Sequence, residues 1–342
     1  MNQAGVRVDA TVVDTETSAD VAVVGAGPAG LYAAYCAGFR GLSCALVDAL
    51  PEPGGQIAAL YSEKKIYDVA GHPAVRGRDL VDNLVAQVAP FRPEYLLGRA
   101  ALSLAPDEGG GWAIGLEGGG RVRARAVVVA AGLGRPVPRT LPCLGPYQGR
   151  GVAHHVPRPD EHRGRDVVIV GGGDSAVDWA LALVPIARSV TVVHRRSAFR
   201  AHEYGVKQMY ASGARVITDA QVVACRGAGH LEEVLVRAGE EQWALPAQSL
   251  VGALGFITDL GPVANWGLRM ENRRIVVDAA MRTNFSKVYA IGDMCSYEGR
   301  VPLISVGFGE AATAANHVAV DLRPGSRLAP DHSTDIDGAS IS

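Results

Sequence analysis

Residues 21–30 read VAVVGAGPAG and residues 168–176 read VIVGGGDSA, so the chain twice runs from apolar residues into a glycine-rich turn. The β-branched runs predict buried strands, and the helical spacing of apolar residues after each turn predicts a helix. Glycines at a strand-to-helix turn let the backbone approach a pyrophosphate at the helix N-terminus. The two stretches therefore predict an α/β fold with two Rossmann-like dinucleotide-binding domains.

The first turn carries Gly25, Gly27 and Gly30, which match the spacing G-x-G-x-x-G. A second strand, CALVD at 44–48, ends in Asp48, about 20 residues after the turn. A carboxylate at this place accepts hydrogen bonds from a ribose 2'-hydroxyl. We therefore expect the first domain to bind a dinucleotide without a 2'-phosphate, and a flavin dinucleotide is the natural candidate.

The second turn carries Gly171, Gly173 and Ala176, but no acid follows its second strand, VTVVH at 190–194. Instead the strand leads into four basic residues: His194, Arg195, Arg196 and Arg200. Guanidinium groups match a 2'-phosphate in charge and in fork geometry, which favours NADPH over NADH. The alternative is a solvated basic strand end that binds no ligand.

Composition excludes several functions. A chain of 342 residues with 42 glycines fits two α/β domains. Its net charge of −2 gives no field that would attract nucleic acid. It has no apolar signal segment at its start and no stretch near the roughly 18 apolar residues of a membrane span, so we expect a cytoplasmic protein. Five cysteines without a C-x-x-C or a cluster with histidines predict neither a metal site nor a disulfide framework.

Two further segments, VVVAAGLG at 127–134 and TNFSKVYAIGDM at 283–294, look like strand ends, and the second delivers Asp293, whose carboxylate can bind flavin ribityl hydroxyls. With HRRSAFRA at 194–201 and both turns, these segments resemble the thioredoxin-reductase-like flavoproteins over essentially the whole chain. The resemblance implies an FAD domain formed by residues 1–140 and 261–342. An NADPH domain, residues 141–260, would be inserted into it.

Thioredoxin reductases carry a C-x-x-C dithiol just before the second glycine turn, whereas this chain has GVAHHVPRPDEHRGRDVVIVGGGD there. Without a dithiol, a reduced flavin passes electrons to an external acceptor, and it can do so singly. Three segments resemble the ferredoxin-NADP reductases of this family: GGQIAALYSEKKIYDVAG at 54–71, the second glycine turn with its basic strand end, and RLAPDHSTD at 327–335.

The resemblance also implies which residues form the two sites. Tyr61 and His332, the latter from the C-terminal tail, would stack on opposite faces of the flavin ring. The residues expected to contact FAD are Gly25, Gly27, Ala29, Gly30, Asp48, Gln56, Tyr61, Ala101, Pro136, Asp293 and Thr334. Those expected to contact NADPH are Gly171, Gly173, Asp174, Ser175, Ala176, His194, Arg195, Arg196 and Arg200. The chain departs from the family at Pro136, where an aromatic residue is usual, and at Ser62, where proline is usual.

We therefore expect an enzyme that exchanges electrons between NADP(H) and ferredoxin or flavodoxin through FAD. Hydride would pass directly to the flavin, so no catalytic acid or base is expected. The resemblance implies a homodimer in which the tail of one subunit covers the flavin of the other. One alternative is a biosynthetic flavoenzyme that uses NADPH to reduce a small organic substrate, and another is a redox sensor without catalysis.

Overall fold

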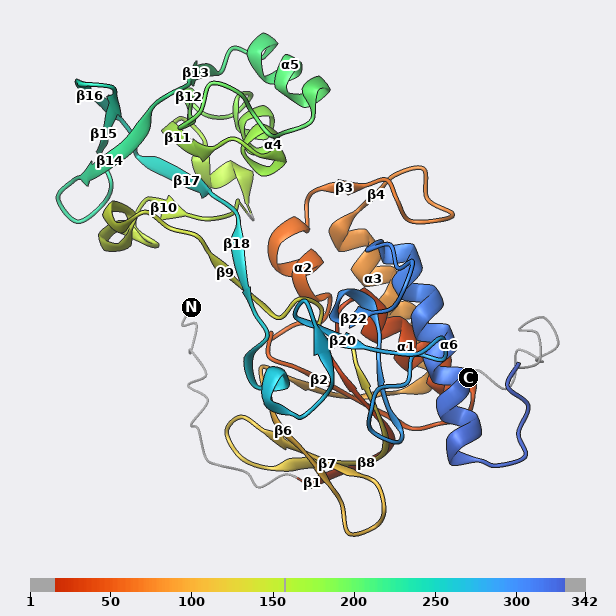
Figure 1. Cartoon of the computed structure of the whole chain (residues 1–342). Helices are drawn as coiled ribbons and strands as arrows, with labels where there is room; N and C mark the ends of the chain where they lie inside the picture. Colours follow the sequence, from red (N-terminus) through yellow and green to blue (C-terminus); the bar gives the residue numbers. More distant parts are fainter. Residues whose placement is uncertain (1–15, 157, 330–342) are drawn as a thin grey trace, which may run out of the picture. The chain divides into compact units, whose positions relative to one another are not determined.

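The computed structural model describes residues 16–156 and 158–329, which form two compact units (Figure 1). Of these residues, unit 1 contains 16–135 and 259–329, and unit 2 contains the stretch between them. Unit 2 is thus inserted into unit 1. The sequence placed the boundaries at 140 and 260, a few residues later than the structure does. The chain passes from one unit to the other in two strands, β9 (Arg135–Pro138) and β18 (Phe256–Asp259), and these strands pair with each other.

Unit 1 is built on a seven-stranded sheet with the order β5-β2-β1-β8-β7-β6, in which β21 also pairs with β8. β5, β2, β1, β8 and β21 are parallel, whereas β6 and β7 form an antiparallel extension. β1 is apolar at 21–24 and buried on both faces, as expected for a central parallel strand. The strands are β1 (Glu16–Val24), β2 (Cys44–Asp48), β5 (Glu94–Leu97), β6 (Ala101–Pro106), β7 (Trp112–Leu116), β8 (Arg121–Val129) and β21 (Val288–Ala290).

Helices α1 (Pro28–Phe39) and α6 (Ile304–Leu322) lie side by side (Figure 1). Their buried positions are rich in alanine, which lets the two helices approach closely. Helix α1 begins directly after the extended Gly27, with Pro28 at its first position, where a missing N–H costs nothing. The other elements of unit 1 are α2 (Gly55–Tyr61), β3 (Lys65–Ile66), β4 (Val75–Arg76), α3 (Gly77–Val88), β19 (Met270–Glu271), β20 (Arg274–Val276), β22 (Cys295–Ser296) and the 3-10 turns η1 (Ala89–Phe91), η4 (Gly261–Asn265) and η5 (Gly292–Met294).

Unit 2 repeats the strand-turn-helix plan on a five-stranded parallel sheet with the order β10-β17-β11-β12-β13. In β11, Val167 and Ile169 pack on the core beneath α4, whereas Val168 and Val170 face the opposite core. Both faces are thus buried. Besides β9 and β18, the elements are the 3-10 turns η2 (Pro142–Tyr147) and η3 (Pro159–His162), β10 (Val152–Ala153), β11 (Asp166–Gly171), α4 (Asp174–Leu183), β12 (Ser189–Val193), α5 (Glu203–Ala211), β13 (Arg215–Ile217), β14 (Gln221–Arg226), β15 (Glu233–Ala238), β16 (Glu241–Pro246) and β17 (Ser249–Ala253).

Within residues 16–156 and 158–329, every helix is too short or too polar to cross a membrane.

Candidate dinucleotide sites

The first glycine of each turn is required by the protein itself. A Cβ added at Gly25 would lie 2.3 Å from the carbonyl oxygen of Ala130, and one at Gly171 would lie 2.2 Å from that of Ala253. Ala130 follows β8 and Ala253 ends β17, the neighbours of β1 and β11. Each turn therefore sits where the strand order reverses, which is where open α/β sheets bind ligands.

The second glycine of each turn faces open space instead. Gly27 and Gly173 precede α1 and α4 with extended backbones, at φ −73° and −99°. A Cβ on Gly27 would meet only the Gly55 Cα at 3.9 Å, and one on Gly173 would meet nothing within 4 Å. The protein itself has room for a side chain at either position. A ligand bound against the helix N-terminus would need that space, and this explains a glycine at both positions. Both cradles fit the pyrophosphate of a dinucleotide.

Asp48 lies beside the first turn at the end of β2. Its Oδ2 accepts a hydrogen bond from the Ala26 N–H at 2.6 Å, and its Oδ1 accepts one from the Leu50 N–H at 2.8 Å. Burial raises the pKa of this carboxyl, and the two N–H groups oppose the rise. A carboxylate has about four acceptor positions, so Asp48 retains capacity for ribose hydroxyls.

The N-terminus of α2 lies on the same turn, because the Gly54 N–H donates to the Ala26 carbonyl at 2.8 Å. Gln56, the second residue of α2, donates through Nε2 to the Gly134 carbonyl at 3.3 Å. This bond brings the segment after β8 to the site. Gln56 is therefore placed beside the turn, where the sequence predicted a flavin contact.

Tyr61 and Ala101 lie farther along the chain from the turn. Tyr61 ends α2, with the Lys64 ammonium 5.2 Å from its ring centroid. Burial raises the pKa of the Tyr61 phenol, so the ring is neutral at pH 7. Ala101 begins β6 and is buried, two residues after Arg99, whose N–H donates to the Asp48 carbonyl.

The loop that carries Asp293 meets the turn from the other half of unit 1. A Cβ added at Gly292 would lie 3.2 Å from the Cβ of Ala29, and one added at Gly307 of α6 would lie 3.6 Å from it. The Asp293 side chain is 49% exposed and 3.5 Å from the Arg300 guanidinium. The fold thus unites residues more than 250 positions apart in the chain.

Sequence reasoning missed Arg300 and Glu310, which form a buried ion pair behind this loop. One signal was present: Glu310 is a lone acid in the apolar stretch 304–320. Its partners could not be read from the pattern, because the pairing depends on how the loop folds over α6.

In unit 2, His194 and Arg200 support the second turn through packing and backbone contacts. His194 is buried, and its ring packs so closely on Gly172 that a Cβ there would lie 2.1 Å from it. The Arg200 N–H donates to the Gly172 carbonyl at 2.8 Å. Asp174 accepts the His202 N–H at 2.8 Å through Oδ1. The loop that follows β12 is therefore fixed to the glycine turn.

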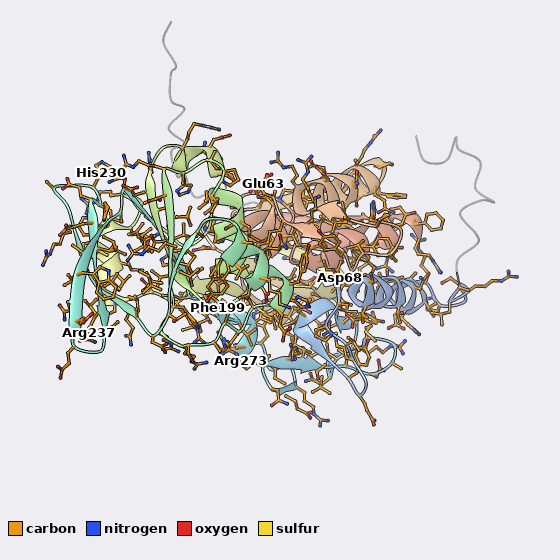
Figure 2. All side chains as sticks on the ribbon, turned by 90° about the horizontal axis from the view of Figure 1, so that it is seen from above. Glu63, Asp68, Phe199, His230, Arg237 and Arg273 are labelled. Atoms are coloured by element: carbon orange, nitrogen blue, oxygen red, sulfur yellow. The ribbon has the colours of Figure 1, made fainter. Side chains whose placement is uncertain are left out.

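Arg195 and Arg196 lie in the loop after β12, one residue beyond the strand's end, and are exposed. Phe199, labelled in Figure 2, lies within the same loop. Its ring centroid is 4.9 Å from that of His194. Ser175 and Ala176 lie in the first turn of α4. The loop thus carries two exposed arginines and a packed pair of aromatic rings.

Three predicted FAD contacts cannot be placed in this way. His332 and Thr334 lie outside the described residues. Pro136 lies in β9, which joins the units.

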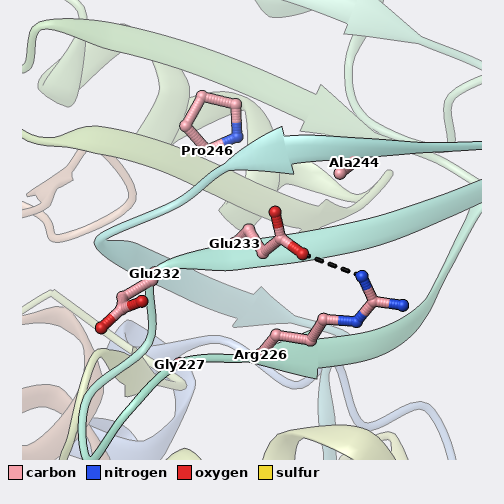
Figure 3. A pocket seen from close by; sticks show the side chains of 6 residues that line it. All are labelled: Arg226, Gly227, Glu232, Glu233, Ala244 and Pro246. Atoms are coloured by element: carbon pink, nitrogen blue, oxygen red, sulfur yellow. Dashed lines mark hydrogen bonds and ion pairs between the residues drawn. The ribbon is translucent and has the colours of Figure 1, made fainter.

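A pocket in unit 2 lies on the antiparallel sheet β14-β15-β16, and Figure 3 shows its lining: Arg226, Gly227, Glu232, Glu233, Ala244 and Pro246. The Arg226 guanidinium pairs with Glu233 at 3.0 Å, so these charges already satisfy each other. Among residues 16–156 and 158–329, no group of three or more His, Cys, Asp or Glu side chains could hold a metal ion.

Two Rossmann-type units, one inserted into the other and each with a glycine cradle at its switch point, define the class of two-dinucleotide-binding-domain flavoproteins. The family model described as pyridine nucleotide-disulphide oxidoreductase matches residues 19–317. The chain therefore belongs to the pyridine nucleotide-disulphide oxidoreductase family.

Similar proteins narrow this assignment. A protein named ferredoxin--NADP reductase from Saccharopolyspora erythraea is 57% identical over 321 residues, which cover 93% of this chain and 97% of the relative. A protein of the same name from Thermus thermophilus is 47% identical over 324 residues, covering 92% and 96%. The resemblance to ferredoxin-NADP reductases predicted from the sequence is confirmed.

The fold class is confirmed as well. The crystal structure of T. acidophilum thioredoxin reductase has a TM-score of 0.74 to this chain at 24% identity, covering 89% of this chain and 98% of that one. Lactococcus lactis thioredoxin reductase has a TM-score of 0.73, also at 24% identity, covering 89% and 99%.

Proposed function

We propose that this chain is an FAD-dependent ferredoxin-NADP reductase. The main observation in support is the contrast between two otherwise equivalent cradles. The first is followed by Asp48, and the second by Arg195 and Arg196. Relatives at 57% and 47% identity bear the same enzyme name. They favour ferredoxin, or flavodoxin as a carrier of the same kind, over a small organic substrate.

The residues of unit 1 bind and orient FAD. The cradle at Gly27 and the N-terminus of α1 hold the pyrophosphate, and Asp48 accepts hydrogen bonds from the ribose. Asp293 accepts hydrogen bonds from the ribityl chain. Gln56 and Tyr61 lie against the flavin ring, and an aromatic face there excludes water. Ala101, Pro136 and Thr334 complete the contacts, and His332 covers the second face.

Unit 2 binds NADPH in the corresponding way. The cradle at Gly173 holds the pyrophosphate, with Ser175 and Ala176 in the first helical turn beside it. Arg195, Arg196 and Arg200 bind the 2'-phosphate. Bound at the residues of unit 1, FAD would supply a hydride acceptor for NADPH and a donor of single electrons to ferredoxin. The chain itself supplies no catalytic acid or base and has no C-x-x-C dithiol in this path.

Anaerobic reduction tests the proposal. NADPH added to the purified yellow protein should bleach the flavin absorbance, and oxidised ferredoxin added next should restore it as ferredoxin becomes reduced. Bleaching that only a small organic oxidant reverses would favour the biosynthetic alternative. A flavin that NADPH does not reduce would identify a redox sensor instead.

We further propose that the enzyme works in the cytoplasm as a homodimer whose tails cover the partner flavins. Sedimentation of the full chain should then give twice the monomer mass of 35.7 kDa. A monomer that retains full activity would contradict the exchange of tails.

Ferredoxin reduction should weaken as salt is added. Ferredoxins are generally acidic, and surface arginines of this chain would raise the association rate by electrostatic steering. Raising ionic strength from about 0.01 to about 0.5 M cuts the screening length from ~30 Å to below ~8 Å. We expect kcat/KM for ferredoxin to fall roughly tenfold or more. Reduction of an uncharged dye serves as the control and should change little, whereas an unchanged ferredoxin rate would contradict charged docking.

A further inference from the structure

Glu310 is a buried acid in a helical stretch that is otherwise free of charge. It lies on α6, and residues 304–320 contain no other Asp, Glu, Lys or Arg. Its side chain is only 2% exposed. Burying an ionised carboxylate is costly unless it is paired and hydrogen-bonded, so the partners of Glu310 indicate what the acid does.

The carboxylate of Glu310 binds the η5 turn in two ways: directly at the Gly292 backbone N–H, and through Arg300 at the Asp293 side chain. Its Oε2 accepts the Gly292 N–H at 2.7 Å. Its Oε1 accepts hydrogen bonds from the Arg300 Nε at 2.9 Å and from the Tyr297 hydroxyl at 3.0 Å. Arg300, itself 5% exposed, reaches Oδ1 of Asp293 at 3.5 Å. One ion pair therefore fixes the start of the turn and its carboxylate together.

The turn held in this way meets the first glycine turn, through the close approach of Gly292 to Ala29. Gly292 has φ +67°, a conformation that glycine adopts readily. The Arg274 Nε also donates to the Asp293 carbonyl at 3.1 Å, so the turn is fixed from β20 as well. These contacts hold the backbone of the η5 turn beside the cradle, with the Asp293 side chain 3.5 Å from the Arg300 guanidinium.

We propose that Arg300 and Glu310 are positioning residues of the flavin site, which hold Asp293 toward the ribityl chain and set the local charge that the flavin experiences. The inference rests on the proposed binding of FAD by unit 1. The carboxylates of Asp293 and Glu310 are balanced by the guanidinium groups of Arg300 and Arg274, so the loss of one carboxylate would leave a net positive charge at this end of the site. Cys295 beside them adds none, because burial raises the pKa of its thiol to about 12.

Glu310→Gln and Glu310→Ala separate positioning from charge. The glutamine amide oxygen can still accept the Gly292 N–H, whereas its NH2 group can no longer accept from the Arg300 Nε. Because the backbone of the turn stays bound, FAD should bind no more than about threefold more weakly. Removing the negative charge should favour the reduced flavin by about tenfold, which for a two-electron couple raises the midpoint potential by about 30 mV. Alanine removes the acceptor as well, so FAD should bind at least roughly tenfold more weakly.

Asp321→Asn is the matched control. Asp321 lies on the same helix, and its carboxylate accepts hydrogen bonds from the Arg282 guanidinium at 3.1 Å and from the hydroxyl of the buried Tyr289, two residues that lie outside η5. Its replacement should lower Tm without changing the midpoint potential or the affinity for FAD. The proposal is overturned if the Glu310 variants behave in the same way as this control.

Arg300→Lys provides a second test of the positioning role if Glu310→Ala fails to fold. It retains the charge but cannot reach both carboxylates as a planar fork, so we expect weaker FAD binding at an unchanged potential. Unchanged FAD binding in this variant would overturn the positioning role. The wild-type protein is measured first, and a wild type that binds no FAD would reject the proposed function rather than this role alone.

Discussion

Replacing Gly27 by alanine should abolish tight FAD binding while the protein without FAD stays as stable as wild type. The backbone at Gly27 has φ −73°, which alanine adopts without strain, and the added Cβ would have only the Gly55 Cα nearby, at 3.9 Å. A change of this kind alters the free energy of unfolding by no more than about 1 kcal/mol. The Cβ would instead occupy space used by the pyrophosphate.

The loss should be large because backbone hydrogen bonds to a charged phosphate contribute about 1.5–3 kcal/mol each. Losing two of them corresponds to an increase of at least about a hundredfold in the dissociation constant of FAD. Fluorescence titration of the FAD-free protein measures it, and circular dichroism measures Tm. Wild-type affinity in this variant would mean that the cradle does not hold the cofactor.

Two variants control for the added methyl group. Gly309→Ala lies on the exposed face of α6, where an added Cβ meets nothing within 4 Å, and it should leave FAD binding unchanged. Gly173→Ala makes the same change in the second cradle. It should weaken NADPH binding and spare FAD, since each cradle is expected to serve its own ligand.

The elements around each glycine turn could be predicted because local sequence determines them. The structure has a helix from Pro28, directly after Gly27, and a strand that ends at Asp48, as the patterns indicated. The start of β1 was not predictable in this way. Residues 16–20, ETSAD, are mostly polar, yet they extend the strand because residues 16–19 pair with residues 121–124 of β8.

The second half of the candidate flavin site depends on tertiary contacts that no local pattern encodes. Nothing in AIGDM shows that the Gly292 N–H is bound by an acid 18 residues later. The role of His194 differs from the predicted one for the same reason. It was grouped with the arginines as a basic residue, and the structure places its ring beneath Gly172, where it shapes the turn.

Replacing both Arg195 and Arg196 by alanine should erase the preference for NADPH over NADH, which we expect to be at least about tenfold in kcat/KM. Each charge-assisted hydrogen bond to the 2'-phosphate contributes about 1.5–3 kcal/mol, and the exposure of both side chains argues for the lower end. Even half of that sum from two arginines exceeds tenfold, since ~1.4 kcal/mol is a factor of ten.

The kinetic signature should separate binding from chemistry. The 2'-phosphate lies far from the nicotinamide and does not change during the reaction, so its contacts are equal in the ground and transition states. Losing them should raise KM for NADPH and leave kcat within about twofold. The values for NADH should hardly move, because that cofactor has no group for the arginines to bind.

The control is the double replacement of Arg215 and Arg237 by alanine. Both are exposed arginines of unit 2, on β13 and β15, and Arg237 is labelled in Figure 2. This variant loses the same net charge from strands outside the loop that follows β12, so a preference that depends on local contacts should survive in it. If the control loses the preference equally, a general positive field selects NADPH. If wild type already uses NADH as well as NADPH, Arg195 and Arg196 are only a solvated strand end, and the choice of cofactor must be made elsewhere in the cradle.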